Sequence, residues 1–593
     1  MTTVRLCRVA LAFALTCMAA PACAWESVIT GDPDGPAFAT DVQVAADGDP
    51  VVCGRDKDGW IVARIDADTG RQLWIHHGVS IPSPAPGIFA AARTVALDSA
   101  GDVLVGGPGL TVEKLRGDTG TLLWSRSFDF SSSSYWVQDI VVDPSGDAVV
   151  AGRLSLSIVV MRLAATDGAT VWQYQATGSS AGFPLEETVA LEPDGAGGVV
   201  IGGSIYNGPA VRDDVLLARV ALVDGSETWR VERDTTPPGA PSGTYDRFSG
   251  LAVANGGVFS IFSRLFDGGI VVSRHVASDG SPDWEHTAFA GYSGPLVVDG
   301  GGDVLAIADD GVIKVRGSDG APLWTAPIPG PFGSPASGLT DIVIDANDDV
   351  VVSGEGGPSG YGFFETVRLN GITGAVEQVQ PLFNPNAFIP HGAATAVVVD
   401  PTGARVAVGL TLREHNLDSM LDLVALRTDE RLRGRRLSLI DPSPERRLLK
   451  FTVKDNFLLA PAPATFDDPT IGGASLELTN PTTLETVTMP LPVAGWSAIA
   501  ARTPGTHGYR YTDKSGALGP CTSVTITGRK GIVARCLGAG VAFSLDEASQ
   551  GQIDLVVRFS PGGTRACISF GGVIRDQPGL FTAINSAAPA TCP

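Results

Sequence analysis

Short apolar runs and polar turns alternate along residues 25–430 in a pattern that repeats. Each copy opens with an apolar run that ends in aspartate, such as "DIVVD" (139–143), "DIVID" (341–345) or "AVVVD" (396–400). A turn of the "PSGD" type and a second run such as "AVVAG" follow, and a connection of variable length leads to a third run such as "IVVMRLA". The fourth run starts after a D-x-T-G or x-D-G turn. Four short strands per copy of about 40–57 residues predict one blade of a β-propeller.

The fourth strand of most copies carries a tryptophan four residues after the glycine of its turn. The seventh copy keeps Gly374 but has Gln378 where tryptophan is expected. A ligand would not need so many equivalent stacking platforms, so we expect these tryptophans to wedge each blade against the next one. The predicted turn tryptophans are Trp25, Trp74, Trp124, Trp172, Trp229, Trp284 and Trp324.

The number of blades follows from counting strands. Eight first strands are expected near 41–47, 93–98, 138–143, 188–193, 249–253, 295–299, 341–345 and 396–400, but only seven fourth strands lie inside the repeat. The segment "AWESVIT", which places Trp25 before an apolar run, can supply the missing strand. We therefore predict an all-β, eight-bladed propeller over residues 25–435 whose last blade is closed by the N-terminal strand. A seven-bladed ring with a degenerate eighth segment is the alternative.

The phrase R-h-D-A-x-T-G-x-x-x-W, as in "RIDADTGRQLW" (64–74), resembles the repeat of pyrroloquinoline quinone (PQQ)-type β-propellers. The resemblance covers roughly residues 25–435 and implies the fold; the family includes quinoprotein dehydrogenases and non-catalytic scaffolds such as outer-membrane assembly lipoproteins. In the alcohol and methanol enzymes of that family, a tryptophan and a disulfide of adjacent cysteines sandwich the quinone, and a calcium ion polarises it. This propeller has one cysteine, Cys53, so no cofactor is expected; PQQ is disfavoured, and calcium is left open.

After "RTDERLRGRRLSLIDPSPERR" the repeat stops, and residues 446–593 predict a β-sandwich-like module rich in hairpins. Its end, "FTAINSAAPATCP", resembles that of an uncharacterised module of secreted bacterial proteins. A turn at Gly528-Arg529 sets Thr527 opposite Lys530 and thereby Cys521 opposite Cys536. That disulfide leaves Cys567 to pair with Cys592, while Cys53 is expected to be a small buried residue.

Residues 1–24 have the arginines, apolar run and Ala-Cys-Ala end of a secretory signal peptide, with cleavage expected near Ala24. Lipidation at Cys23 is the alternative. We predict a secreted or periplasmic protein without a transmembrane segment. The net charge of −22 becomes −24 once the leader is removed, which disfavours nucleic acid and anionic lipid as partners at long range.

The turns between first and second strands and between third and fourth strands are short, whereas the other connections are long and varied. Long loops gathered on one face of a disc are where binding usually resides. We therefore expect an exported, non-catalytic scaffold that recognises a protein or glycan through this face; a degenerate PQQ/calcium dehydrogenase or other propeller enzyme is the main alternative, and an envelope-assembly factor a third. The candidate binding residues are Tyr135, Trp136, Tyr206, Tyr245, Arg247, Tyr361, Phe383, Phe388, His391, Arg413 and His415.

Overall fold

The computed structural model describes most of the chain from residue 25 onward. The described residues are 25–29, 37–56, 58–67, 69–78, 91–128, 136–154, 157–178, 188–207, 213–235, 246–264, 267–291, 293–309, 311–328, 336–356, 363–382, 392–401, 403–415, 418–428, 431–455, 458, 460–461, 467–500, 507–528, 530–560, 565–571 and 573–589. The predicted signal peptide and its cleavage site lie outside them.

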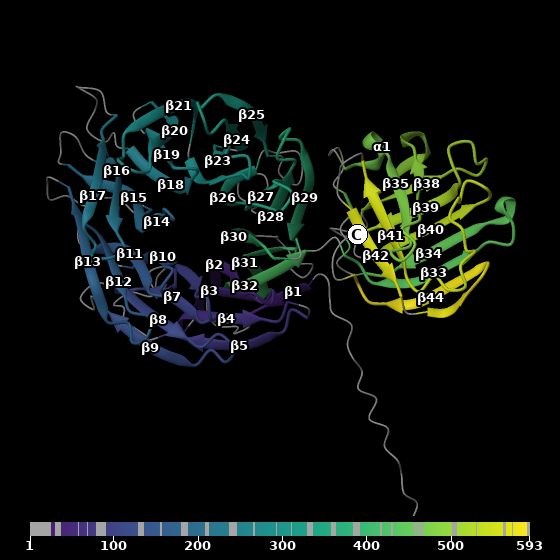
Figure 1. The fold of residues 1–593 in the computed structure, drawn as a ribbon, viewed down its shortest axis with the longest axis horizontal. Helices are drawn as coiled ribbons and strands as arrows, with labels where there is room; N and C mark the ends of the chain where they lie inside the picture. The colour runs from purple at the N-terminus through teal and green to yellow at the C-terminus, as the bar shows by residue number, and fades with distance from the viewer. Residues whose placement is uncertain are drawn as a thin grey trace, which may run out of the picture.

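Eight four-stranded antiparallel sheets are arranged as a ring (Figure 1). The first three blades are β2 (Phe38–Val44), β3 (Pro50–Asp56), β4 (Gly59–Ile65) and β5 (Gln72–His77); β6 (Thr94–Leu97), β7 (Val103–Gly107), β8 (Thr111–Leu115) and β9 (Leu122–Ser127); and β10 (Val137–Val142), β11 (Ala148–Leu154), β12 (Ser157–Leu163) and β13 (Thr170–Thr177). The fourth and fifth are β14 (Ala190–Pro193), β15 (Gly198–Tyr206), β16 (Asp213–Ala221) and β17 (Glu227–Arg233); and β18 (Asp246–Ala254), β19 (Gly257–Arg264), β20 (Gly269–Val276) and β21 (Pro282–Ala290). The sixth and seventh are β22 (Ser293–Val298), β23 (Val304–Ala308), β24 (Gly311–Val315) and β25 (Pro322–Pro327); and β26 (Ala336–Ile344), β27 (Val350–Gly356), β28 (Phe363–Leu369) and β29 (Val376–Leu382).

The last blade combines the two ends of the propeller. Its strands in spatial order are β1 (Trp25–Val28), β32 (Asp418–Thr428), β31 (Arg405–His415) and β30 (Gly392–Val399). β1 runs antiparallel to β32 in a register that sets Trp25 opposite Arg427, and the N–H of Ile29 extends the pairing to the carbonyl of Leu423 at 3.1 Å. The N-terminal strand therefore completes the sheet formed by the last three propeller strands.

The propeller core lies between neighbouring sheets rather than in one central mass. Eight clusters of buried apolar side chains each join residues of two adjacent blades, the last one bringing Ile29 and Ala39 against Val408 and Leu423. Because the second and third strands of each blade are packed on both faces, they are apolar nearly throughout, as the sequence pattern indicates.

Each described turn tryptophan docks on the next blade. The indole Nε1 of Trp74 donates to the carbonyl of Gly117 at 2.9 Å, and that of Trp172 to Leu222 at 2.8 Å. Trp124, Trp229, Trp284 and Trp324 make equivalent bonds of 3.1, 2.9, 3.0 and 3.3 Å. The ring also covers the turn glycine of the next blade: a Cβ built on Gly168 would lie 2.6 Å from the indole of Trp124. The side chain of Trp25 is not among those that the structure describes.

A cation of the third strand reinforces these contacts at several interfaces. Arg64 donates to the carbonyl of Gly117 at 2.8 Å, the same acceptor as that of Trp74, and Lys314 to Gly371 at 2.9 Å, the acceptor of Trp324. Both cations are buried and are neutralised by aspartates of the first turn of their own blade: Asp49 lies 3.0 Å from Arg64. We call this arrangement of tryptophan, cation and shared carbonyl the interblade clamp. The role of the cation was not predicted from the sequence, although a cation precedes the D-x-T-G turn in most copies.

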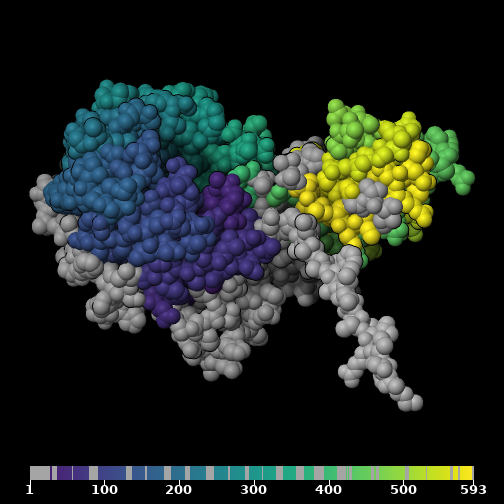
Figure 2. All heavy atoms as spheres, turned by 60° about the horizontal axis from the view of Figure 1, so that its bottom comes forward, coloured from purple at the N-terminus to yellow at the C-terminus, as the bar shows by residue number. Residues whose placement is uncertain are grey.

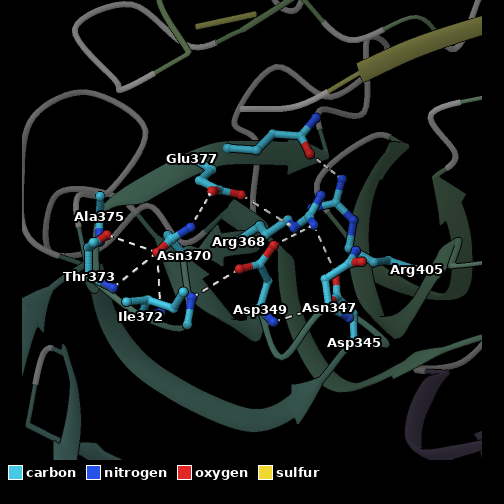
Figure 3. A network of polar contacts seen from close by, with 12 residues as sticks. Asp345, Asn347, Asp349, Arg368, Asn370, Ile372, Thr373, Ala375, Glu377 and Arg405 are labelled. Carbon is cyan, nitrogen blue, oxygen red and sulfur yellow. Dashed lines mark hydrogen bonds and ion pairs between the residues drawn. The ribbon is translucent and has the colours of Figure 1, made fainter. Parts of the chain in front are cut away.

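The seventh blade uses a polar substitute for tryptophan (Figure 3). Gln378 is buried, and its side-chain oxygen accepts a hydrogen bond from Arg405 of the eighth blade. Arg368 contacts Asp345 at 3.0 Å and Asp349 at 2.7 Å, so the cation and aspartates of the repeat are retained. The interface keeps a cross-blade contact although the aromatic ring is absent.

The C-terminal module lies beside the propeller (Figures 1 and 2), and its strands form the two sheets of a β-sandwich. Its larger sheet has the order β37 (Trp496–Ile499), β38 (Gly508–Thr512), β39 (Cys521–Thr527), β40 (Gly531–Leu537), β34 (Leu448–Val453), β33 (Gly434–Ile440), β44 (Leu580–Ser586) and β43 (Val573–Gln577). The smaller sheet has the order β36 (Thr486–Leu491), β35 (Ala474–Thr479), β41 (Ile553–Phe559) and β42 (Arg565–Phe570). Short helical turns occur at η2 (Pro444–Arg446), α1 (Pro469–Gly472) and η3 (Val493–Gly495). One apolar cluster, which includes Phe451, Tyr511 and Phe581, fills the space between the sheets.

The module begins earlier than the predicted residue 446. β33 pairs with both β34 and β44, so the sandwich includes residues from Gly434 onward. Within β33, Leu437 and Leu439 are buried, whereas Arg436 and Ile440 are exposed. This alternation is that of a sheet strand with one face toward a core.

The predicted Cys521–Cys536 disulfide is present, but the hairpin register differs from the predicted one. Thr527 lies opposite Gly531 rather than Lys530, and a bulge between Cys521 and Ser523 brings the two cysteines back into opposition. Cys567 is disulfide-bonded as well, and its predicted partner Cys592 lies outside the described residues. Cys53 is a free, buried thiol.

Candidate functional site at the centre of the ring

The innermost strands of the blades carry bulges that send polar side chains across to the next blade. The register of β2, β26 and β30 shifts at Thr40, Thr340 and Thr395. Each of these hydroxyls donates to a backbone carbonyl of the following blade, at 2.6 Å for Thr40 to Ala92 and 2.7 Å for Thr340 to Ala394. Thr395 donates to Ala39 at 2.9 Å and so joins the eighth blade to the first on the inner side of the ring.

Three aspartates each follow a bulge of an innermost strand: Asp41 in β2, Asp341 in β26, and Asp139 in β10, whose register shifts at Gln138. Asp41, Asp139 and Asp341 each accept the N–H of the following residue and, at 2.7–2.9 Å, an N–H from the innermost strand of the next blade. Burial raises the pKa of Asp41 to about 6 and those of Asp139 and Asp341 to about 7, against the opposing effect of these N–H donors. The charge of Asp41 further raises the pKa of the other two, so these carboxyls take up protons near neutral pH.

A cavity of about 410 Å³ opens at the end of the ring where the innermost strands begin. Its wall includes Phe38, Arg93, Trp136, Gln138 and Arg247. The guanidinium of Arg93 lies over the indole of Trp136, 3.9 Å from the ring centroid, while the side chain of Arg247 is exposed. Thr40 and Thr395 line the same cavity, and no carboxylate is among its described lining residues. We call this cavity the channel mouth.

The structure places two of the predicted binding residues, Trp136 and Arg247, together in the channel mouth. Tyr206 ends β15 and does not line it. Arg413 and His415 belong to β31, but their side chains are not described. Tyr135, Tyr245, Tyr361, Phe383, Phe388 and His391 lie outside the described residues. Phe38, Arg93 and Gln138 were not predicted from the sequence, because they lie at or just before the start of an innermost strand rather than in the long connections.

The raised carboxyl pKa values predict that stability falls as pH rises from about 5 to 8. In the folded state Asp41, Asp139 and Asp341 hold their protons at pH values where the unfolded chain has already released them. This proton binding stabilises the folded state below the folded pKa values, and the stabilisation is lost as the pH rises through them. Burial likewise raises the pKa of Glu192 and Glu377 to about 7 and that of Asp214 to about 6. His275 acts in the opposite direction, because burial lowers its pKa to about 4. With six carboxyls against one histidine, we expect the melting temperature to drop by several degrees over this range.

The variant Asp139→Asn should show a shallower dependence of melting temperature on pH, whatever its absolute stability. The matched control is Asp224→Asn, because Asp224 is exposed and hydrogen bonds from Ser226 lower its pKa, so it stays ionised throughout. Equal slopes for both variants and the parent chain would contradict the proposed contribution of Asp139.

Comparison with known proteins is consistent with this architecture. A family model described as outer membrane protein assembly factor BamB matches residues 26–161 and 57–326, which together span half of the chain. No curated protein sequence matches the chain.

Several solved structures are similar in fold. BamB from Moraxella catarrhalis is 15% identical, with a TM-score of 0.43 over 66% of this chain and 96% of that one. The quinohemoprotein alcohol dehydrogenase from Comamonas testosteroni is 11% identical, with a TM-score of 0.45 over 68% of this chain and 76% of that one. The computationally designed protein Ika8 is 15% identical, with a TM-score of 0.43 over 66% of this chain and 97% of that one. At these identities the likeness concerns the fold alone.

Proposed function

Because this chain belongs to the PQQ-type β-propeller repeat family that includes BamB, we propose that it is a non-catalytic binding scaffold that captures a protein or glycan at the channel mouth. The observation that carries the proposal is the composition of that cavity. Arg93 stacked on Trp136 and the exposed Arg247 stand beside Phe38 in a hollow of about 410 Å³.

The chemistry of the channel mouth suits recognition of a side chain or sugar. Arginine and aromatic residues dominate the energetics of protein interfaces, since they combine apolar area with directional hydrogen bonds. Arg93 is held in place by the indole beneath it, so less conformational entropy is lost when it binds a partner. With two arginines and no carboxylate among the described lining, the cavity favours an acidic or hydrogen-bond-accepting group.

The residues of the channel mouth do not fit a PQQ–calcium site. A quinone would need a free face of an indole for stacking. The guanidinium of Arg93 already covers one face of the Trp136 indole. The described lining offers no carboxylate to hold calcium, and the described chain as a whole has no cluster of three His, Cys, Asp or Glu side chains placed for a metal. Cys53, the free thiol of the propeller, is fully buried in the core between the first two blades. These features support a scaffold rather than a quinoprotein enzyme.

The compartment that we propose is extracytoplasmic. The module holds a disulfide between Cys521 and Cys536, and such bonds persist in oxidising compartments. No helix in the described part of the chain is long and apolar enough to cross a membrane. A secretory leader over residues 1–24 would deliver the chain there.

The proposal can be tested by site-specific photocrosslinking in cells that express the protein. A photoreactive amino acid at position 247 should yield a discrete crosslinked species, because Arg247 is exposed at the channel mouth. The matched control is position 119, since Thr119 is exposed in the short β8–β9 turn, at the opposite end of the blade's strands. For a glycan partner, binding to a glycan array should weaken in Arg247→Glu and not in Arg71→Glu, which alters an exposed turn.

Two results would overturn the proposal. One is equal crosslinking from positions 247 and 119 together with glycan binding that is the same in Arg247→Glu as in the parent protein. The other is a saturable rise in melting temperature with PQQ and calcium, which would favour the enzyme.

A further inference from the structure

One face of the large sheet in the C-terminal module is exposed and rich in cations. Figure 1 shows β33, β34, β40 and β44 grouped in this module, and the inward side chains of these strands form its core. The outward positions of neighbouring strands align in rows across the sheet. We call the surface formed by the outward residues of β33, β34, β38, β39, β40, β43 and β44 the outer sheet face.

A row of basic and hydroxyl side chains crosses this face. The pairing sets Arg575 opposite Thr582, Thr582 opposite Ser438, Ser438 opposite Lys450, and Lys450 opposite Arg535. Since adjacent strands lie about 4.8 Å apart, the cations at the two ends of this row are separated by roughly 19 Å. Lys450, Arg535 and Arg575 are exposed.

Two further arginines belong to the next row of the same face. The pairing sets Arg436 opposite Thr452 and Thr452 opposite Val533. It continues with Val533 opposite Thr525 and Thr525 opposite Arg510. Among the described residues, none of these five cations forms an ion pair, and the outward positions of the described strands hold no Asp or Glu. The described residues of this face therefore do not neutralise its positive charge.

An apolar row runs beside the first cation row. The register aligns Leu580, Ile440, Leu448 and Leu537 on four consecutive strands. Ile440 and Leu537 are each 37% exposed, and Leu448 and Leu580 are partly exposed. A continuous apolar row on the solvent side of a sheet requires a reason beyond folding, because outward positions of a one-sided sheet are normally polar.

The charge of the whole chain is segregated. Residues 431–593 contain 17 Lys and Arg and 12 Asp and Glu, a net charge of +5, whereas residues 1–430 contain 25 and 52, a net charge of −27. An anionic surface thus repels the propeller and attracts the outer sheet face, which orients the molecule before contact. The sequence-based expectation that anionic lipid is disfavoured used the total charge and does not apply to this face.

We propose that the outer sheet face docks the protein on an anionic lipid surface. The cations meet the phosphates of the headgroups while the row of Leu448, Ile440, Leu537 and Leu580 enters the boundary with the acyl chains. A lipid surface offers both anionic and apolar groups over an extended area, which matches the parallel rows. A polysaccharide would match the cations but leave the apolar row uncovered.

The test is co-sedimentation of the protein, lacking residues 1–24, with vesicles of phosphatidylcholine alone and with about 30% phosphatidylglycerol. We expect binding only to the anionic vesicles, lost at about 0.5 M salt through screening. The double variant Lys450→Glu/Arg535→Glu should weaken binding at least about tenfold. The matched control, Arg71→Glu/Arg126→Glu, makes the same change in net charge at exposed propeller positions and should leave binding unchanged.

A second variant tests the apolar row without altering charge. Leu448→Ser/Leu537→Ser should also reduce vesicle binding, and an unchanged melting transition would show that the module remains folded. Failure of the parent protein to bind anionic vesicles would overturn the proposal, as would equal losses in the two charge variants. Binding to an acidic polysaccharide without vesicle binding would assign the face to a polyanion instead.

Discussion

A chain that starts after residue 29 will lose much of the stability of its propeller compared with one that starts at Trp25. The deletion removes four paired residues from the edge of β32 and the buried side chain of Ile29, which packs against both the first and the last blade. Loss of a buried isoleucine alone costs about 2–5 kcal/mol, and the exposed edge of β32 adds to it. We expect the free energy of unfolding to fall by at least about 4 kcal/mol, measured by denaturant unfolding followed through tryptophan fluorescence.

The variant Ile29→Ala separates the contributions to this loss. It keeps the backbone pairing with β32 and should fall between the parent and the deletion. A deletion variant that unfolds at the same denaturant concentration as the parent would show that residues 25–29 behave as a tail and that the ring does not depend on them.

The second large effect is expected for Gly168→Ala, which tests the interblade clamp. Gly168 has a φ of 69°, and a Cβ there would lie 2.6 Å from the indole of Trp124 and 2.9 Å from Cγ of Arg126. The new methyl group must push the tryptophan away from the third blade and lengthen its 3.1 Å hydrogen bond to Ala165. Overpacking of this kind costs about 1–3 kcal/mol in addition to the backbone strain.

Gly101→Ala is the matched control for that substitution. Gly101 also has a positive φ, 80°, but a Cβ there meets nothing within 4 Å. Both variants therefore incur the left-handed backbone penalty of about 1–2 kcal/mol, and only Gly168→Ala disturbs a clamp. Equal changes in unfolding free energy would mean that the tryptophans contribute little to the association of blades.

Much of the propeller could be predicted from sequence because its information is periodic and local. The first strands, the turn glycines and the tryptophans recur at recognisable positions, and the strand count left one place for the N-terminal segment. In the hairpin of β39 and β40, the pairing of the two cysteines was predicted correctly. The register at the turn and the compensating bulge at Thr522 were not predicted. A bulge depends on how a strand meets its neighbours, and no residue count reveals it.

The channel mouth was predicted only in part for a related reason. Trp136 and Arg247 stand out because they adjoin long connections, whereas Phe38 and Arg93 look like ordinary strand residues. These residues meet because several blades converge on the centre of the ring, and they are far apart in sequence. The cations of the outer sheet face were not predicted either. They are far apart in sequence, and only the cross-strand register brings residues of β34, β40 and β43 into one row.

The pairing of β1 with β32 also sets the order in which this protein can be completed. About 390 residues separate the two strands, so the first strand to be synthesised waits for the last strand of the propeller. Blades formed from consecutive strands can assemble as the chain emerges and carry the two ends toward each other, which keeps the entropy cost of this long closure modest. A chain truncated before residue 418 would leave its first strand without the partner that it has here. The ring can therefore close only when the propeller chain is complete, and in an unfinished chain the N-terminal strand β1 remains unpaired.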